Sequence, residues 1–128
     1  EPGYLCDGTC DGDIDGDGRK DYITGAGWMR QPASLQFGED WEFHEFAFFD
    51  RTGDSPYAKL NGGGDMFAYD VNGDGLNDVI TSIDAHGWGL VWFEQIRDGD
   101  KITFQEHDFR SFLCFSLRLY FGFLPLVP

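Results

Sequence analysis

The chain has 128 residues, of which 41% are hydrophobic and 17% aromatic, so it can form the core of one ordinary domain and is not a disordered tail. Its 23 acidic residues against 9 Lys and Arg give a net charge of −14, which argues against nucleic acid or an anionic membrane as the partner, because both need a basic face. We therefore expect no nucleic-acid partner and no membrane partner.

The N-terminal stretch, residues 1–12, is rich in Gly and Cys, and only Tyr4–Cys6 has the composition of a short strand. Cys6 and Cys10 are four residues apart and could form a disulfide in an oxidising compartment. Unpaired thiols fit the odd count of 3 cysteines equally well, so the redox state of this pair stays open.

Two nine-residue stretches share the pattern D-x-[DN]-x-D-G-x-x-D, one beginning at residue 13 and the other at residue 70. Oxygen-bearing side chains at the first, third, fifth and ninth positions suit a hard cation, because Ca²⁺ is bound by roughly 6–8 oxygens. The glycine at the sixth position lets the chain turn sharply with positive φ, and the seventh residue would offer its backbone carbonyl. The predicted ligands are Asp13, Asp15, Asp17, Arg19 and Asp21 in the first loop, and Asp70, Asn72, Asp74, Leu76 and Asp78 in the second loop. We therefore predict two calcium loops, with about one Ca²⁺ in each.

The two loops differ in charge, because Asn72 stands in the second loop where the first has Asp15. More carboxylates attract a cation more strongly and repel one another more in its absence. We therefore expect the first loop to gain more Coulomb attraction from a bound ion. A solvated turn rich in Asp and Gly is the alternative interpretation, and two copies in one register argue against it.

The rest of the first half is expected to be β-structure. Residues 21–28 are rich in β-branched and aromatic residues and predict a strand, with a short third strand around Trp28–Met29. Residues 41–48 alternate until their phase slips at Glu45–Phe46, which predicts a half-buried strand that could contain a bulge. The Gly- and Pro-containing residues 50–65 predict a loop between two units.

The second half contains clearer strand patterns. They lie at residues 66–69, 78–83, 90–96 and 101–107, with a hairpin turn at 97–100. Together they predict a four-stranded antiparallel meander in which the acidic loop joins the first strand to the second. The halves align at an offset of 57 residues at both Asp13/Asp70 and Thr24/Thr81, so we expect two copies of a unit of about 60 residues.

The second copy resembles the FG-GAP or VCBS type of repeat, which occurs in integrin-alpha-like propellers and in large exported bacterial proteins. The resemblance rests on residues 69–82 and 86–94, and it extends over residues 4–108. In that family each repeat is one blade of a β-propeller, and the loop binds Ca²⁺ as a structural ion. The resemblance therefore implies an all-β chain of two four-stranded antiparallel blades, with the loop residues named above as ligands. The first copy departs from the pattern at Cys10–Gly12, where no apolar strand is present, and this leaves its edge pairing open.

The domain organisation implied by this resemblance is a divergent first repeat at residues 1–60, a second repeat at 61–110 and an apolar tail at 111–128. A propeller closes with about 4–8 blades, so two blades need further blades of the same protein, or copies of the chain, as partners. For the tail we leave three interpretations open: a stretch foreign to the blade, a segment that covers a blade edge, and a membrane anchor of marginal length.

These observations predict a non-catalytic, calcium-stabilised module of an exported adhesion or recognition protein. We expect an extracellular, cell-surface or periplasmic location, because millimolar Ca²⁺ is found outside the cytosol. A carbohydrate or protein ligand would fit this role. The sequence has no G-x-S-x-G motif and no phosphate-binding loop, and the loop carboxylates would be committed to the cation, so we expect no enzymatic activity.

Three other functions compete with this prediction. One is a fragment of a propeller-type carbohydrate-active enzyme, such as a polysaccharide lyase. Another is a lectin that stacks sugars on its Trp side chains, although most of the 4 Trp are expected in the core. An EF-hand or dockerin is disfavoured, because the twelfth position of the loops is Thr24 or Thr81 where an EF-hand needs Glu.

Overall fold

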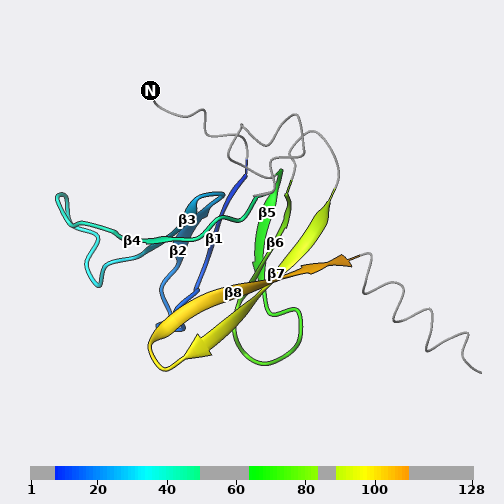
Figure 1. The fold of residues 1–128 in the computed structure, drawn as a ribbon. Helices are drawn as coiled ribbons and strands as arrows, with labels where there is room; N and C mark the ends of the chain where they lie inside the picture. The colour runs from blue at the N-terminus through cyan, green and yellow to red at the C-terminus, as the bar shows by residue number, and fades with distance from the viewer. Residues whose placement is uncertain (1–7, 50–63, 84–88, 110–128) are drawn as a thin grey trace, which may run out of the picture.

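The computed structural model describes residues 8–49, 64–83 and 89–109 of the chain. Within these residues the secondary-structure elements are all strands, and they form two four-stranded antiparallel sheets (Figure 1). The predicted all-β fold class and the two meanders are therefore confirmed. The strand expected at Tyr4–Cys6, most of the loop expected at 50–65, and the apolar tail lie outside the described residues.

The first sheet has the strand order β1-β2-β3-β4, so each strand pairs with its neighbour in sequence. Its strands are β1 (Thr9–Gly12), β2 (Asp21–Thr24), β3 (Gly27–Arg30) and β4 (Glu42–Glu45). β1 pairs with β2 along its full length, from Thr9 opposite Thr24 to Gly12 opposite Asp21. The edge pairing that the sequence left open is thus present.

The strand expected from residue 21 is present as β2 but ends at Thr24, and the short third strand expected around Trp28–Met29 is confirmed as β3. The hairpin that joins these strands was not predicted. The Thr24 hydroxyl accepts a hydrogen bond from the Ala26 amide and donates one to the Gly27 carbonyl, both at 3.2 Å, and this closes a tight turn. Gly27 has a φ of 151°, and a Cβ on it would lie 2.2 Å from the His44 carbonyl oxygen. The small residues Gly25 and Ala26 form the turn between β2 and β3.

The bulge that could lie at Glu45–Phe46 falls at the end of the paired region, where the amides of Phe46 and Phe48 donate to the carbonyls of Ala26 and Gly25 at 3.1 and 2.8 Å. β3 and β4 pair without interruption from Gly27 opposite Glu45 to Arg30 opposite Glu42. The phase slip reflects aromatic residues on both sides of this segment, since Phe43 is 52% exposed whereas Phe48 is completely buried.

The second sheet follows the predicted pattern closely, with the order β5-β6-β7-β8. Its strands are β5 (Met66–Tyr69), β6 (Asp78–Ser82), β7 (Leu90–Asp98) and β8 (Lys101–Asp108). β7 continues to Asp98, which pairs with Lys101, so the turn contains only Gly99 and Asp100. Gly99 adopts a φ of 59°, a conformation that glycine reaches without steric cost.

The two sheets share one hydrophobic core, and β1 lies against β5 (Figure 1). The buried members come from both sheets and from the segments beside them: Ile14, Ile23, Trp28, Phe48, Met66, Val79, Val91, Phe93 and Phe104. A Cβ on Gly12 would lie 2.3 Å from the Cβ of Ala68, so glycine is what allows β1 to approach β5. Phe48 leaves the first sheet and packs its ring against Phe93 and Phe104 of the second, at centroid distances of 5.2 and 4.9 Å.

Among the described residues there is no helix long and apolar enough to cross a bilayer.

Candidate metal centre

The first acidic loop joins β1 to β2 and is organised around the carboxylate of Asp13. Its Oδ1 accepts hydrogen bonds from the amides of Gly16 at 2.7 Å and Asp17 at 3.0 Å, and its Oδ2 accepts one from Gly18 at 2.9 Å. Gly16 and Gly18 have φ values of 80° and 85°, which allow the chain to curl its amides toward this side chain. The spacing pattern predicted this role for Gly18 but not for Gly16.

Asp21 closes the loop from the first position of β2, and it is completely buried. Its Oδ2 accepts a hydrogen bond from the Ile14 amide at 2.8 Å, and its Oδ1 accepts one from the Gln31 amide at 2.9 Å. Burial raises the pKa of this carboxyl, the charge of Asp15 raises it further, and the two amides act in the opposite direction. The carboxylate of Asp21 is therefore held at the site without full contact with water.

Three of the predicted carboxylates meet in space. Oxygen atoms of Asp13, Asp15 and Asp21 all lie within 4.8 Å of one another. Two oxygens bound to one Ca²⁺ at about 2.3–2.6 Å can be no more than about 5 Å apart, so this spacing is compatible with a single hard cation. Asp17 is not part of the group.

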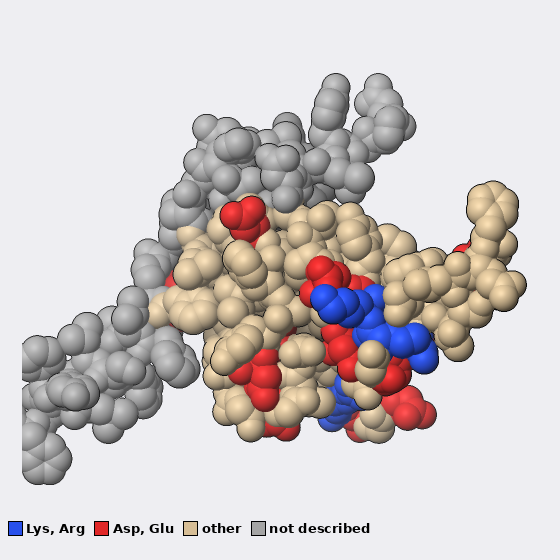
Figure 2. Space-filling view, turned by 180° about the vertical axis from the view of Figure 1, so that it is seen from behind, with Lys and Arg blue, Asp and Glu red and all other residues tan. Residues whose placement is uncertain are grey.

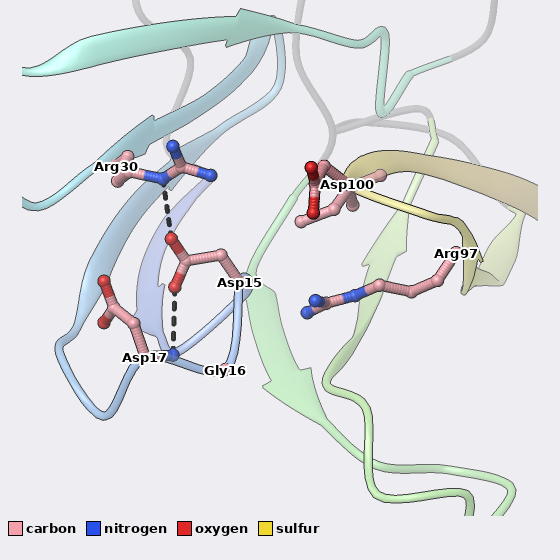
Figure 3. A pocket seen from close by; sticks show the side chains of 7 residues that line it. Asp15, Gly16, Asp17, Arg30, Arg97 and Asp100 are labelled. Carbon is pink, nitrogen blue, oxygen red and sulfur yellow. Dashed lines mark hydrogen bonds and ion pairs between the residues drawn. The ribbon is translucent and has the colours of Figure 1, made fainter.

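Basic side chains pair with the remaining loop oxygens. Asp17 Oδ1 accepts a hydrogen bond from the Arg19 amide at 2.8 Å, and its Oδ2 forms an ion pair with the Arg19 guanidinium. Arg30 on β3 places its Nε 2.6 Å from Asp15 Oδ2 (Figure 3). The loop charge is therefore partly offset within the protein. The backbone carbonyl of Arg19 stays a predicted ligand.

The second acidic loop, between β5 and β6, makes the equivalent hydrogen bonds. Asp70 Oδ1 accepts from the amides of Gly73 at 2.7 Å and Asp74 at 3.1 Å, and its Oδ2 accepts from Gly75 at 2.8 Å. Asp78 is completely buried, as Asp21 is, and it accepts hydrogen bonds at 2.9 Å from the amides of Val71 and Gln95. Gly73 and Gly75 have φ values of 79° and 88°, close to those of the first loop. Two stretches of different sequence thus hold their first and ninth acidic residues in the same way.

Asn72 is where the second loop differs. Its Oδ1 accepts a hydrogen bond from the Asp74 amide at 3.0 Å, and its Nδ2 donates to Asp74 Oδ2 and to Glu94 Oε1, both at 3.1 Å. Asp74 Oδ1 also accepts a hydrogen bond from the Leu76 amide at 2.8 Å. This loop therefore has only two acids, Asp70 and Asp78, at the positions of the first loop's triad. The Leu76 carbonyl stays a predicted ligand.

The spacing pattern did not predict the groups that reach each loop from elsewhere in the chain. They are the backbone amides of Gln31 and Gln95 and the side chains of Arg30, Asn77, Glu94, Gln95 and Arg97. No spacing pattern in the local sequence indicates these contacts. The one signal available is that Arg30 and Arg97 belong to the 9 basic residues of a very acidic chain, where each positive charge should find an acidic partner or a carbonyl oxygen.

A cleft of about 410 Å³ opens beside the first loop, against the turn between β7 and β8. Its lining is Asp15, Gly16, Asp17, Arg30, Arg97, Asp100 and Ile102. Arg30 and Arg97 lie on opposite sides of Asp15 (Figure 3). The basic side chains visible on the face shown in Figure 2 likewise lie among acidic ones. The cleft is thus lined by both charges and reaches the candidate cation ligands.

The other candidate groups of the sequence are mostly buried or lie outside the described residues. Trp28 and Trp92 are 2% and 7% exposed, in agreement with the expected core positions. His44 stacks on Trp28 at 4.1 Å, and His107 stacks on Trp92 at 4.6 Å. Cys10 has a free thiol, and its predicted disulfide partner lies outside the described residues.

The chain shows no match to a protein-family model, to a curated protein or to a solved structure. Its function is therefore argued from the geometry of these residues.

Proposed function

We propose that the chain is a calcium-stabilised, non-catalytic module of an exported adhesion or recognition protein, with about one Ca²⁺ bound in each acidic loop. The observation that carries this proposal is the equivalence of the two loops. The carboxylates of Asp13 and Asp70 each accept hydrogen bonds from three backbone amides, and those of Asp21 and Asp78 each accept two. The donor–acceptor distances match between the loops. A turn that only reversed the chain would not need a buried carboxylate in both copies.

The donor set supports a hard cation. The side chains that converge offer only carboxylate and amide oxygens, which are the ligands that Ca²⁺ and Mg²⁺ take, and they include no thiolate or imidazole. Ca²⁺ accepts irregular coordination more readily than Mg²⁺, which demands near-ideal octahedral geometry. Asp13, Asp15 and Asp21 would hold the ion in the first loop, and Asp70, Asn72 and Asp78 in the second. Bound Ca²⁺ would relieve the repulsion among these carboxylates.

The strand arrangement supports the blade part of the proposal. Each sheet is a four-stranded meander with the acidic loop between its first and second strands, as the FG-GAP or VCBS resemblance implies. We therefore propose one repeat within residues 1–60 and one within 61–110. Partners of such blades would be further blades or copies of the chain.

The lectin alternative would use the Trp side chains. Sugar stacking needs an open aromatic face, and Trp28 and Trp92 are buried and stacked on His. Among the described Trp residues only Trp41, at 37%, is exposed. For the enzyme alternative, His44 is the described histidine that could serve, and its ring stacks on Trp28 at 4.1 Å. We propose neither function.

Calorimetric titration of the full chain with CaCl₂ tests the metal proposal. We expect about two ions per chain and weaker binding of Mg²⁺. Asp13→Ala and Asp70→Ala should each remove one site, whereas Asp40→Ala, an exposed residue outside both loops, should leave both sites intact. The absence of binding heat, or equal losses in all three variants, would overturn the proposal.

Thermal unfolding gives a second, independent readout. An ion bound only by the folded chain stabilises it by mass action, by about 2.7 kcal/mol when the free ion is at 100 times its Kd. Excess EGTA should therefore lower Tm, and CaCl₂ should restore it. An unchanged Tm would contradict a structural role for the ion.

A further inference from the structure

The exposed large apolar side chains of the strands lie on two outer faces, one on each sheet. On the first sheet, Tyr22, Met29 and Phe43 lie in one row across β2, β3 and β4. Tyr22 is 39% exposed and Phe43 is 52% exposed, whereas their neighbours on the opposite side, Ile23 and Trp28, are buried in the core. We name the row Tyr22, Met29 and Phe43 the first outer face.

The second sheet has the corresponding surface on β5 and β7. Phe67 and Tyr69 are 60% and 64% exposed, and Leu90 and Ile96 are 54% and 37% exposed. Because side chains alternate along a strand, these four residues lie on the side opposite Val91 and Phe93, which are buried in the core. We name Phe67, Tyr69, Leu90 and Ile96 the second outer face.

The outer side of the second sheet, which includes Phe67 of the second outer face, has the same arrangement as the inner face of the first sheet. On the inner face of the first sheet, paired residues form the row Cys10, Ile23, Trp28 and His44. On the outer side of the second sheet, paired residues form the row Phe67, Ile80, Trp92 and His107. Each row ends in a Trp stacked on a His.

The reverse relation also holds. On the inner face of the second sheet the row is Ala68, Val79, Phe93 and Glu106, and it packs on the first sheet through the shared core. The row at the same register in the first sheet is Asp11, Tyr22, Met29 and Phe43. The first outer face therefore corresponds to the surface that already packs inside the molecule. The exposed aromatic side chains Tyr22 and Phe43 on the first sheet and Phe67 on the second thus lie on the two sides that correspond to the halves of the sheet-to-sheet interface, while Trp92 in the second row is 7% exposed.

We infer that a second copy of this chain docks its first outer face on the second outer face, so that copies associate head to tail. This names the partner within the proposed function and rests on its blade part, but it does not depend on bound Ca²⁺. The contact joins two different surfaces, so each copy keeps one face free for the next, and the series forms a ring if the rotation closes. Because every copy has a net charge of −14, association should strengthen with salt.

Sedimentation velocity of the full chain over a range of concentrations tests the inference. Wild type should form species larger than a monomer. Phe43→Asp and Phe67→Asp should each weaken association roughly tenfold or more, because aromatic residues dominate interface energies. Phe37→Asp is the matched control, since Phe37 is fully exposed and belongs to neither face. It should leave association unchanged.

Mixing the two variants separates head-to-tail contact from a symmetric one. Phe43→Asp retains an intact second outer face, and Phe67→Asp retains an intact first outer face. The mixture should therefore form a one-to-one pair and nothing larger. A symmetric contact between two like faces would be broken by only one of the variants, and that result would overturn the inference.

Milder variants guard against a folding defect. Tyr22→Ser and Tyr69→Ser change exposed side chains on the two faces and should also weaken association while far-UV circular dichroism stays that of wild type. A monomeric wild type, or equal dissociation by Phe37→Asp, would overturn the inference. Repeating the measurement in CaCl₂ and in EGTA distinguishes the two proposals: a monomer that binds Ca²⁺ refutes only the docking, and an assembly that binds none refutes only the metal site.

Discussion

The side-chain amide of Asn77 donates a hydrogen bond of 2.9 Å to the backbone carbonyl of Asp13, which joins the two acidic loops directly across 64 residues of sequence. A second connection comes from Arg97, whose Nη2 donates to the Ile14 carbonyl at 2.9 Å. Gln95 links the two, because its Oε1 accepts from Arg97 Nε at 2.8 Å and its Nε2 donates to the Asn77 carbonyl at 2.6 Å. The loops therefore belong to one hydrogen-bonded network.

Asn77→Ala should lower the free energy of unfolding by about 1–2 kcal/mol, because it leaves the half-buried Asp13 carbonyl without this donor. Asn77→Asp should cost more, since a carboxylate would face the carbonyl oxygen. Urea unfolding monitored by Trp fluorescence measures both values. An Asn77→Asp variant as stable as wild type would contradict the importance of this contact.

Arg30→Gln should raise the Ca²⁺ affinity of the first loop several-fold, by roughly 3- to 10-fold, because it removes a positive charge that pairs with Asp15. The matched control is Lys20→Gln, which makes the same charge change at an exposed residue paired with Asp11. Calorimetric titration compares the two. A similar gain in both variants would mean that only the overall charge matters and that Arg30 does not compete for Asp15.

Phe48→Ala should destabilise the fold by about 3–5 kcal/mol, because it opens a cavity where the two sheets meet. Phe48 is completely buried and contacts Phe93 and Phe104 of the second sheet. Phe37→Ala, at a fully exposed position, should change stability by no more than about 0.5 kcal/mol. Denaturant unfolding of both variants gives the comparison, and equal effects would contradict a core that the two sheets share.

Cys10 should react slowly with iodoacetamide at pH 8. Burial, and secondarily the charge of Asp11, raises the pKa of this thiol from 9.0 to about 11. Only the thiolate reacts, so its fraction at pH 8 is roughly 100-fold below that of an ordinary thiol, and the rate should climb about tenfold per pH unit up to pH 11. Peptide mass spectrometry resolves the labelling of Cys10. Labelling in urea provides the unperturbed rate, and an equally fast folded chain would refute the shift.

The raised pKa of Cys10 also makes the free energy of unfolding depend on pH. The folded chain holds the Cys10 proton more tightly than the unfolded chain does, so this group favours folding below pH 9 and the contribution is lost as the pH rises to about 11. Unfolding curves at pH 8 and pH 11 should differ in this direction, and Cys10→Ser should reduce the difference.

Features that depend on residues close together in the sequence could be predicted from the sequence alone. The two acidic loops were found because the spacing of acidic and Gly residues lies within nine positions, and β5 was found with its bounds because Met66–Tyr69 is flanked by turn residues. The hairpin at Thr24 was missed because its signal is a side-chain hydrogen bond within a run of strand-forming residues. The phase slip near Glu45 falls where β4 ends, and local alternation does not predict that end.

The partners of the loops could not be predicted in the same way. Arg30 reaches Asp15 from another strand, and Asn77 and Arg97 reach the first loop from the second half of the chain. Such contacts depend on how the two sheets pack against each other. Alternation along a strand predicts which face of the sheet a side chain lies on. It does not predict which other strand or loop that side chain contacts.

The hydrogen bond between Arg97 and Ile14 joins residues 83 positions apart, and this separation orders events during synthesis. The ribosome synthesises the first loop before β7, so the Ile14 carbonyl at first lacks its hydrogen bond from Arg97. Phe48 likewise lacks the side chains of Phe93 and Phe104 against which it packs. Loop-closure entropy delays contacts of such long range. The first loop therefore gains its last hydrogen bond late, after β7 with Arg97 has been synthesised.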